Sequence, residues 1–198
     1  TEIDGFFFTS PETTSSDHKT IYGYGYVPIT SEVLISAGAT YDDFDDESTV
    51  SKNRFSPKIG LSWTPIDATT LRTAWLEGLT RNIVSDQTLE PTQLAGFNQF
   101  YDNVKGTESK IYGLGIDHEF SPFLYAGASF IHQELDVPYK DYFLFSGEIE
   151  DNETVWKNQL GKIYFYWLPL QSLSLTFEYL YEKIDRGDEF FGADNFSE

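Results

Sequence analysis

Residues 173–182 read LSLTFEYLYE, and this short stretch decides how the rest of the chain is interpreted. Successive side chains of an extended chain point to opposite sides, so every second residue shares a face. One face here would carry only apolar or aromatic residues: Leu173, Leu175, Phe177, Tyr179 and Tyr181. Serine, threonine and glutamate alternate with them, apart from Leu180. The alternation predicts a β-strand with one apolar and one polar face.

The same alternation recurs along the chain, whereas helical periodicity is hard to find. The alternating segments pair into four predicted hairpins, 20–43, 56–80, 109–134 and 157–184. Each hairpin contains a short link with a proline, which ends a strand because it cannot donate to the ladder. The connections between hairpins are longer, at 44–55, 81–108 and 135–156. The pattern predicts an antiparallel sheet of about eight strands in a single segment, residues 1–198.

The amino-acid composition argues against several classes of function. The chain of 198 residues has 32 acidic and 13 basic side chains, a formal net charge of −19. Nucleic acid is therefore not expected as a partner, because phosphate binding needs a basic surface. The absence of cysteine excludes disulfides, cysteine-ligated zinc and a thiol nucleophile. The mean hydropathy of −0.36 suits a soluble protein, but the alternating strands of a transmembrane β-barrel also average to a low value.

The residues on each face distinguish a membrane barrel from a soluble one. Glycines and charged residues share the face that we take as inner: Gly23, Gly25, Lys58, Gly60, Arg72, Gly113, Gly115, Asp117, Lys162, Glu178 and Glu182. The opposite face carries large rings such as Trp63, Trp75 and Phe165, which suit a lipid-facing band. We therefore expect an all-β, up-and-down transmembrane β-barrel. The alternative is a soluble, secreted β-barrel or sandwich that binds a ligand or a surface partner.

Two stretches carry a family resemblance. Residues 54–81 read RFSPKIGLSWTPIDATTLRTAWLEGLTR, which resembles a hairpin of TonB-dependent receptors, large barrels of the bacterial outer membrane. Residues 89–102 read LEPTQLAGFNQFYD, which resembles a loop in the barrel part of tetratricopeptide-repeat outer-membrane proteins. The resemblance implies the outer membrane of a Gram-negative bacterium, contact with its lipid, and a periplasmic partner. It also implies passage, uptake or export of a solute or polymer.

The arrangement of links and connections predicts an internal piece of a larger barrel. If the proline-marked links lie on the periplasmic side, both chain ends fall on the side of the long connections. Complete single-chain barrels of bacteria place both termini in the periplasm. The small residues of the inner face would also leave an eight-stranded barrel underfilled. Strands 20–27 and 173–184 should then be edges that pair with further strands of a parent barrel, and not with each other.

Charged residues on the inner face are the best candidates for a functional site: Lys58, Arg72, Lys162, Glu178 and Glu182. Charges inside a water-filled lumen set the selectivity of channels, and mixed signs create a field across the lumen. The alternative is that these residues form salt bridges between neighbouring strands and stiffen the wall.

One acidic run could supply oxygen ligands to Ca²⁺: Asp42, Asp43, Asp45, Asp46 and Glu47. Its spacing lacks the glycine of an EF-hand loop, and a hydrated acidic loop is the alternative.

Catalysis finds little support in the sequence. His132, Glu134 and Asp136 share one strand face near the rim, but nothing fixes a nucleophilic water beside them. No serine lies in a Gly-x-Ser-x-Gly turn. We expect no enzymatic activity, no cofactor and no catalytic metal.

Overall fold

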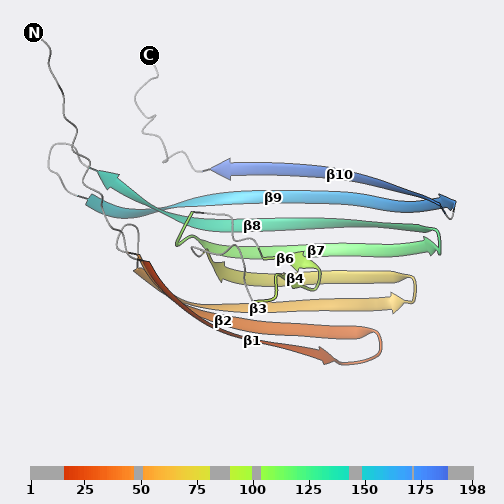
Figure 1. Ribbon diagram of the computed structural model, residues 1–198, viewed down its shortest axis with the longest axis horizontal. Coiled ribbons are helices and arrows are strands. Elements are labelled where there is room, and N and C mark those ends of the chain that lie inside the picture. Colours follow the sequence, from red (N-terminus) through yellow and green to blue (C-terminus); the bar gives the residue numbers. More distant parts are fainter. Residues whose placement is uncertain are drawn as a thin grey trace, which may run out of the picture.

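The computed structural model describes residues 16–46, 51–80, 90–99, 104–142, 149–170 and 172–186. Eight long strands of these ranges form one sheet (Figure 1): β1 (Ser16–Pro28), β2 (Val33–Asp46), β3 (Ser51–Ile66), β4 (Thr69–Leu79), β7 (Glu108–Ser121), β8 (Leu124–Tyr142), β9 (Ile149–Leu170) and β10 (Leu173–Arg186). Neighbours are antiparallel and follow the order of the chain. The predicted up-and-down topology is therefore confirmed. Among the described residues no helix could span a membrane.

The strands are longer than the sequence pattern predicts. β2 and β3 extend into the predicted connection 44–55, and β8 and β9 extend into 135–156. Acidic and polar residues interrupt the alternation there, which is why the sequence suggests a loop. The ladder nevertheless continues to Asp45 of β2, which lies opposite Ser51 of β3 and accepts a hydrogen bond from its hydroxyl.

The sheet is open at both sides. β1 pairs with β2, β10 pairs with β9, and within the described residues no ladder joins β1 to β10. The prediction that these two strands are edges is confirmed.

Register defines two faces of the sheet. One row of paired residues crosses all eight strands and shares a face: Tyr24, Gly38, Lys58, Leu76, Ile111, Gln133, Asn158 and Ile184. We call this the inner face. The opposite, outer face leaves large apolar side chains exposed, such as Ile21 at 70% and Leu114 at 63%.

The predicted placement of Gly23 and Gly25 on the inner face is wrong. Tyr24 lies on that face, with its ring over Gly38 of β2, where any Cβ would clash. Tyrosine and glycine alternate along β1, and from the sequence the large rings are assigned to the lipid-facing side. The tyrosine can nevertheless point inward, because a glycine on the neighbouring strand leaves room for its ring.

The sheet curls toward its inner face at the end of the long connections. Lys52 of β3 forms an ion pair of 2.5 Å with Glu153 of β9, although β4, β7 and β8 lie between them in the sheet. A flat sheet would hold these strands far apart, since neighbouring strands lie about 4.8 Å from each other. The inner face is therefore the hollow side, as in the wall of a barrel.

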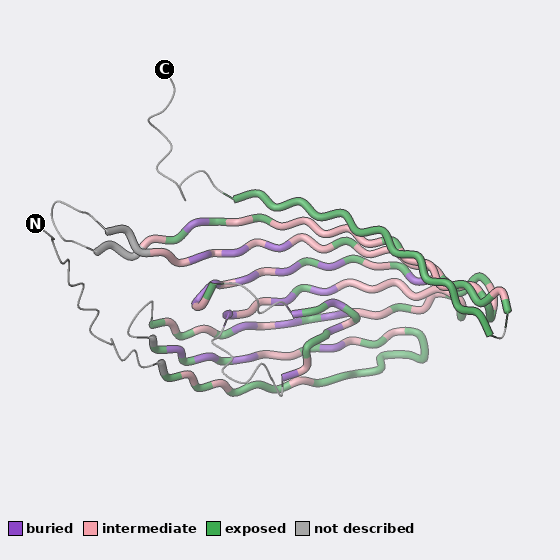
Figure 2. The backbone as a smooth tube through the Cα atoms, turned by 45° about the horizontal axis from the view of Figure 1, so that its top comes forward, coloured by how far each residue is buried: buried purple, intermediate pink, exposed green. Residues whose placement is uncertain are grey.

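A short hairpin lies against the inner face. β5 (Gln93–Leu94) and β6 (Phe97–Asn98) form a separate two-stranded sheet. Their turn contains Ala95 and Gly96, both at positive φ. Leu94 and Phe97 pack with Ala74, Leu76 and Ile111 into a buried cluster, which Figure 2 shows as a concentration of buried positions in the middle strands. We call residues 90–99 the inner hairpin; this return of connection 81–108 onto the wall is not predicted from the sequence.

Candidate functional site

The inner hairpin is held by a buried ion pair. Lys58 of β3 pairs with Glu90, and their side chains are only 1% and 0% exposed. Two hydroxyls connect the same charges: the Lys58 Nζ donates to Thr40 Oγ1 at 2.8 Å and to the Tyr24 hydroxyl at 3.0 Å. Thr40 and Tyr24 in turn donate to Glu90 Oε1 at 2.6 and 2.5 Å. Both buried charges are therefore paired and hydrogen-bonded, as burial requires.

The pKa of Glu90 reflects this environment. Burial alone would raise the pKa of the carboxyl group, because a charge is costly away from water. The Lys58 ammonium and the hydrogen bonds from Lys58, Thr40 and Tyr24 outweigh burial and lower the pKa to about 2. Glu90 is therefore an anion at any physiological pH.

Two glycines of the wall make room for the inner hairpin. A Cβ on Gly113 of β7 would lie 2.5 Å from Cδ1 of Phe97, and a Cβ on Gly60 of β3 would lie 2.8 Å from Cβ of Ala95. Both distances are too short for carbon atoms in contact. Glycine inside a strand often marks such a close approach, and this is the sequence signal that could have revealed the docked segment.

Arg72 of β4 connects the inner hairpin to the middle of the wall. Its Nε donates to Asp117 of β7 at 2.5 Å, and its Nη1 donates to the carbonyl of Ala95 at 3.3 Å. The guanidinium carbon lies 5.4 Å from the centroid of the Phe97 ring, a cation–π contact. The hydroxyl of Tyr164 on β9 donates to the same Asp117.

The other predicted lumen residues lie away from the inner hairpin. Lys162 of β9 and Glu178 of β10 form an ion pair of 3.1 Å, with side chains 36% and 44% exposed. Tyr166 donates to Glu178 at 3.2 Å. Glu182 is exposed on the inner face of β10. The five candidates are thus divided: Lys58 and Arg72 hold the hairpin, while Lys162, Glu178 and Glu182 border open space.

The acidic run 42–47 does not converge on one point in its described part. Asp42 is buried and accepts hydrogen bonds from Thr20 at 2.7 Å and from His18 at 3.1 Å. Asp43 and Asp45 are exposed and, as alternate residues of β2, point to the opposite face. Glu47 lies outside the described residues. Within the described ranges no three His, Asp or Glu side chains are grouped to hold a metal ion.

Sequence reasoning misses an ionic network at the end of the wall where the long connections lie. Arg54 of β3 contacts Glu77 of β4 at 2.9 Å and also pairs with Glu108 of β7. Lys52 joins Glu108 at 3.4 Å and Glu153 of β9. Their cross-strand pairing depends on register, which the sequence does not specify at this polar end.

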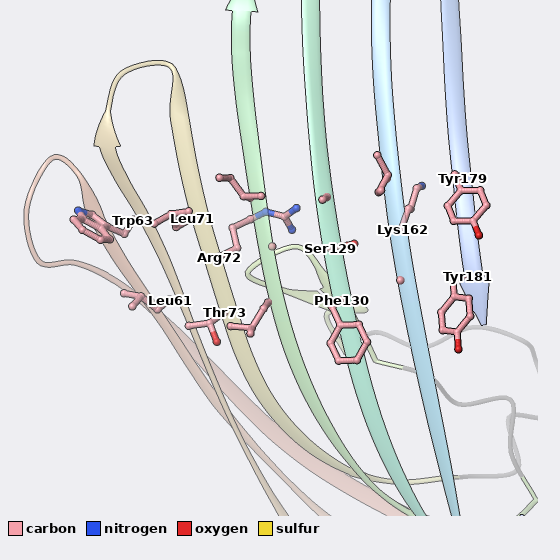
Figure 3. A pocket seen from close by; sticks show the side chains of 16 residues that line it. Leu61, Trp63, Leu71, Arg72, Thr73, Ser129, Phe130, Lys162, Tyr179 and Tyr181 are labelled. Atoms are coloured by element: carbon pink, nitrogen blue, oxygen red, sulfur yellow. The ribbon is translucent and has the colours of Figure 1, made fainter. Parts of the chain in front are cut away.

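A groove of 650 Å³ lies on the outer face, across β3 to β10 (Figure 3). Its labelled side chains are mostly apolar or aromatic, including Leu61, Trp63, Phe130 and Tyr179. Register places Leu61, Trp63, Phe130 and Tyr179 on the side opposite Lys58. Arg72 and Lys162 of the inner-face set also line the groove, but most of its lining belongs to the apolar outer surface.

Comparison with known proteins identifies the class of barrel. The family model described as TonB dependent receptor-like, beta-barrel, matches residues 2–185. The chain belongs to this family. The resemblance of the 54–81 hairpin to TonB-dependent receptors is thereby confirmed, whereas that of 89–102 to tetratricopeptide-repeat proteins stays a prediction. A search of curated proteins finds no match.

Solved structures share the TonB-dependent receptor fold with this chain. The FrpB iron transporter from Neisseria meningitidis, F3-3 variant, has 14% identity and a TM-score of 0.66 over 87% of this chain and 26% of its own. Its F5-1 variant apoprotein has 13% identity and a TM-score of 0.62, with 87% and 26% covered. The alcaligin outer membrane receptor FauA from Bordetella pertussis has 15% identity and a TM-score of 0.61, with 87% and 31% covered. The chain spans about a quarter to a third of these proteins.

Proposed function

We propose that the chain forms part of the wall of a barrel in the outer membrane of a Gram-negative bacterium, and that a solute or polymer crosses the membrane through this barrel. The observation that carries the proposal is the contrast between the faces: exposed apolar residues cover the outer face, while ion pairs and a docked hairpin occupy the hollow inner face. A soluble barrel would reverse this contrast. The role is one of passage and not of catalysis.

The exposed charges of the inner face would meet the solute. Lys162, Glu178 and Glu182 are not buried, so they can attract or repel a charged solute in a wet lumen. Lys58 is covered by the inner hairpin, so it acts on the solute only through the hairpin.

The partners of the chain follow from its edges and surfaces. β1 and β10 would pair with further strands of the parent barrel, because an unpaired edge leaves backbone groups unsatisfied in lipid. The outer face would contact outer-membrane lipid. A periplasmic partner of the TonB type is the family-based proposal for energy coupling.

Transport measurements test the proposal. The structural neighbours are described as an iron transporter and an alcaligin receptor, so ferric complexes are the first solutes to try. In cells that express the parent protein, replacing Lys162→Gln together with Glu178→Gln should change the rate of uptake or the preference for solute charge. Lys183→Gln removes a charge from the outer face of β10 and should leave uptake unchanged. Equal effects of the inner and outer replacements would contradict the assignment of the lumen.

A further inference from the structure

The inner hairpin is attached to the wall by side chains. β5 and β6 form their own two-stranded sheet, and within the described residues no backbone hydrogen bond joins them to the eight-stranded sheet. The backbone N–H of Gln99 instead donates to the Thr92 carbonyl at 2.8 Å, inside the hairpin. The hairpin can therefore leave the wall as a unit without breaking any ladder of the sheet.

The inner hairpin lies at mid-depth of the lumen. It contacts Gly60, Arg72 and Gly113, which are in the middle of β3, β4 and β7 and not at their ends. Its buried residues face the wall, whereas Thr92, Gln93 and Asn98 are exposed. The hairpin thus takes up space in which a solute would otherwise move.

Besides the packing of Leu94 and Phe97, the attachment includes one fully buried ion pair. Lys58 belongs to the wall and Glu90 to the hairpin. Other ion pairs join strands of the wall to each other, such as Arg54 to Glu77 and Arg72 to Asp117. Removing one partner of a buried pair leaves an uncompensated charge, which destabilises strongly. We call the Lys58–Glu90 pair the latch.

We propose that the inner hairpin is a gate in the lumen: docked, it narrows the passage along β1 to β7, and its release from the latch opens that passage. This gate rests on the proposed function, because it presumes that a solute moves through the lumen. The release of the inner hairpin from the wall does not depend on a solute and can be measured without one.

Thiol labelling measures the release. Ser36 is 3% exposed and its Oγ lies beside Gly60, where the hairpin packs. Cysteine is absent from these 198 residues, so Ser36→Cys places one thiol in this part of the wall. Peptide mapping of the label at position 36 in the full-length protein then reports access for a water-soluble maleimide. Adding Lys58→Met should raise the labelling rate on the order of 100-fold. Lys183→Met, on the outer face, should leave the rate unchanged.

A second variant keeps the test decisive if Lys58→Met fails to fold. Tyr24→Phe keeps the ring on the wall but removes the hydroxyl that bonds both latch charges. It should raise the labelling rate less than Lys58→Met does. Labelling at the wild-type rate in the folded latch variants would overturn the proposed release.

A tethered hairpin tests whether release controls transport. A Cβ on Gly60 would lie 2.8 Å from Cβ of Ala95, so Gly60→Cys with Ala95→Cys places two thiols within reach of a disulfide after a small shift. Oxidation should stop uptake of a solute that the wild type transports, and reduction should restore it. Uptake that is unchanged by oxidation, with the cross-link verified, would overturn the gate. A wild type that transports no solute would instead contradict the proposed function, while labelling would still decide on release.

Discussion

Replacing Gly113 with alanine should detach the inner hairpin from the wall. The added Cβ would lie 2.5 Å from Cδ1 and 2.7 Å from Cε1 of Phe97, whereas carbon atoms in contact lie about 3.5–4.0 Å apart. Phe97 is 2% exposed and packs in the buried cluster with Leu76 and Ile111, so the ring cannot move aside without displacing these neighbours. The ring must either strain its surroundings or leave.

Both outcomes weaken docking by a similar amount. Exposing a buried phenylalanine costs about 1.5–3 kcal/mol, and forcing extra volume into a packed site costs about 1–3 kcal/mol. A loss of about 2 kcal/mol lowers the ratio of docked to undocked hairpin roughly 30-fold. Undocking exposes the amides of residues 90–99 to water, so their hydrogen exchange should accelerate by about that factor.

Hydrogen exchange read by mass spectrometry on peptides covering 90–99 checks this expectation. Gly23→Ala is the matched control, because a Cβ there meets nothing within 4 Å. Adding Phe97→Leu to Gly113→Ala shortens the clashing side chain and should restore part of the protection. The reasoning fails if Gly113→Ala exchanges like the wild type in residues 90–99, or if both alanine replacements accelerate exchange equally.

Three further expectations concern pH, lipid and orientation. Docking lowers the pKa of Glu90 from 4.5 to about 2, so ionised Glu90 favours docking above about pH 4.5 and this contribution is lost as the pH falls toward 2. Because the thiolate is the reactive form of a cysteine, the labelling rate of Ser36→Cys is divided at each pH by that of a cysteine at the exposed position Gln93; this ratio should stay constant from about pH 8 to 5 and rise below about pH 4. Phe177→Arg on the outer face should cost about 2–4 kcal/mol of folding free energy in bilayers, against little for Thr176→Arg on the inner face; equal values from urea titration would contradict the assignment of the faces. Protease added to intact cells should cut within 135–156 and spare 28–31, and the reverse pattern would invert the proposed orientation.

The sequence predicts the wall well because strand alternation is a local signal. Residues 173–182 show their two faces within ten positions, and β10 forms as this pattern indicates. The edges are also predicted, since they follow from the count and direction of the strands. The face of β1 is predicted wrongly, because the room for Tyr24 is provided by Gly38 on another strand.

The inner hairpin is beyond such local reasoning. Lys58 and Asp117 are recognised as inner-face charges from alternation alone, but Glu90 lies in a connection with no periodicity to orient it. The latch joins residues 32 positions apart, and its geometry exists only once the strands are in register. Gly60 and Gly113 were the available hint, since a strand interior rarely tolerates glycine without a reason.

The open edges of the sheet determine how these residues can be handled in the laboratory. β1 has 13 residues and β10 has 14, and each presents a row of backbone N–H and C=O groups that β2 and β9 do not satisfy. Long uncovered edges are templates for pairing with other chains. A preparation limited to this segment should therefore associate edge to edge into ribbons or aggregates, in detergent as in water. Stability and binding should therefore be measured on the parent barrel, in which β1 and β10 would pair with neighbouring strands.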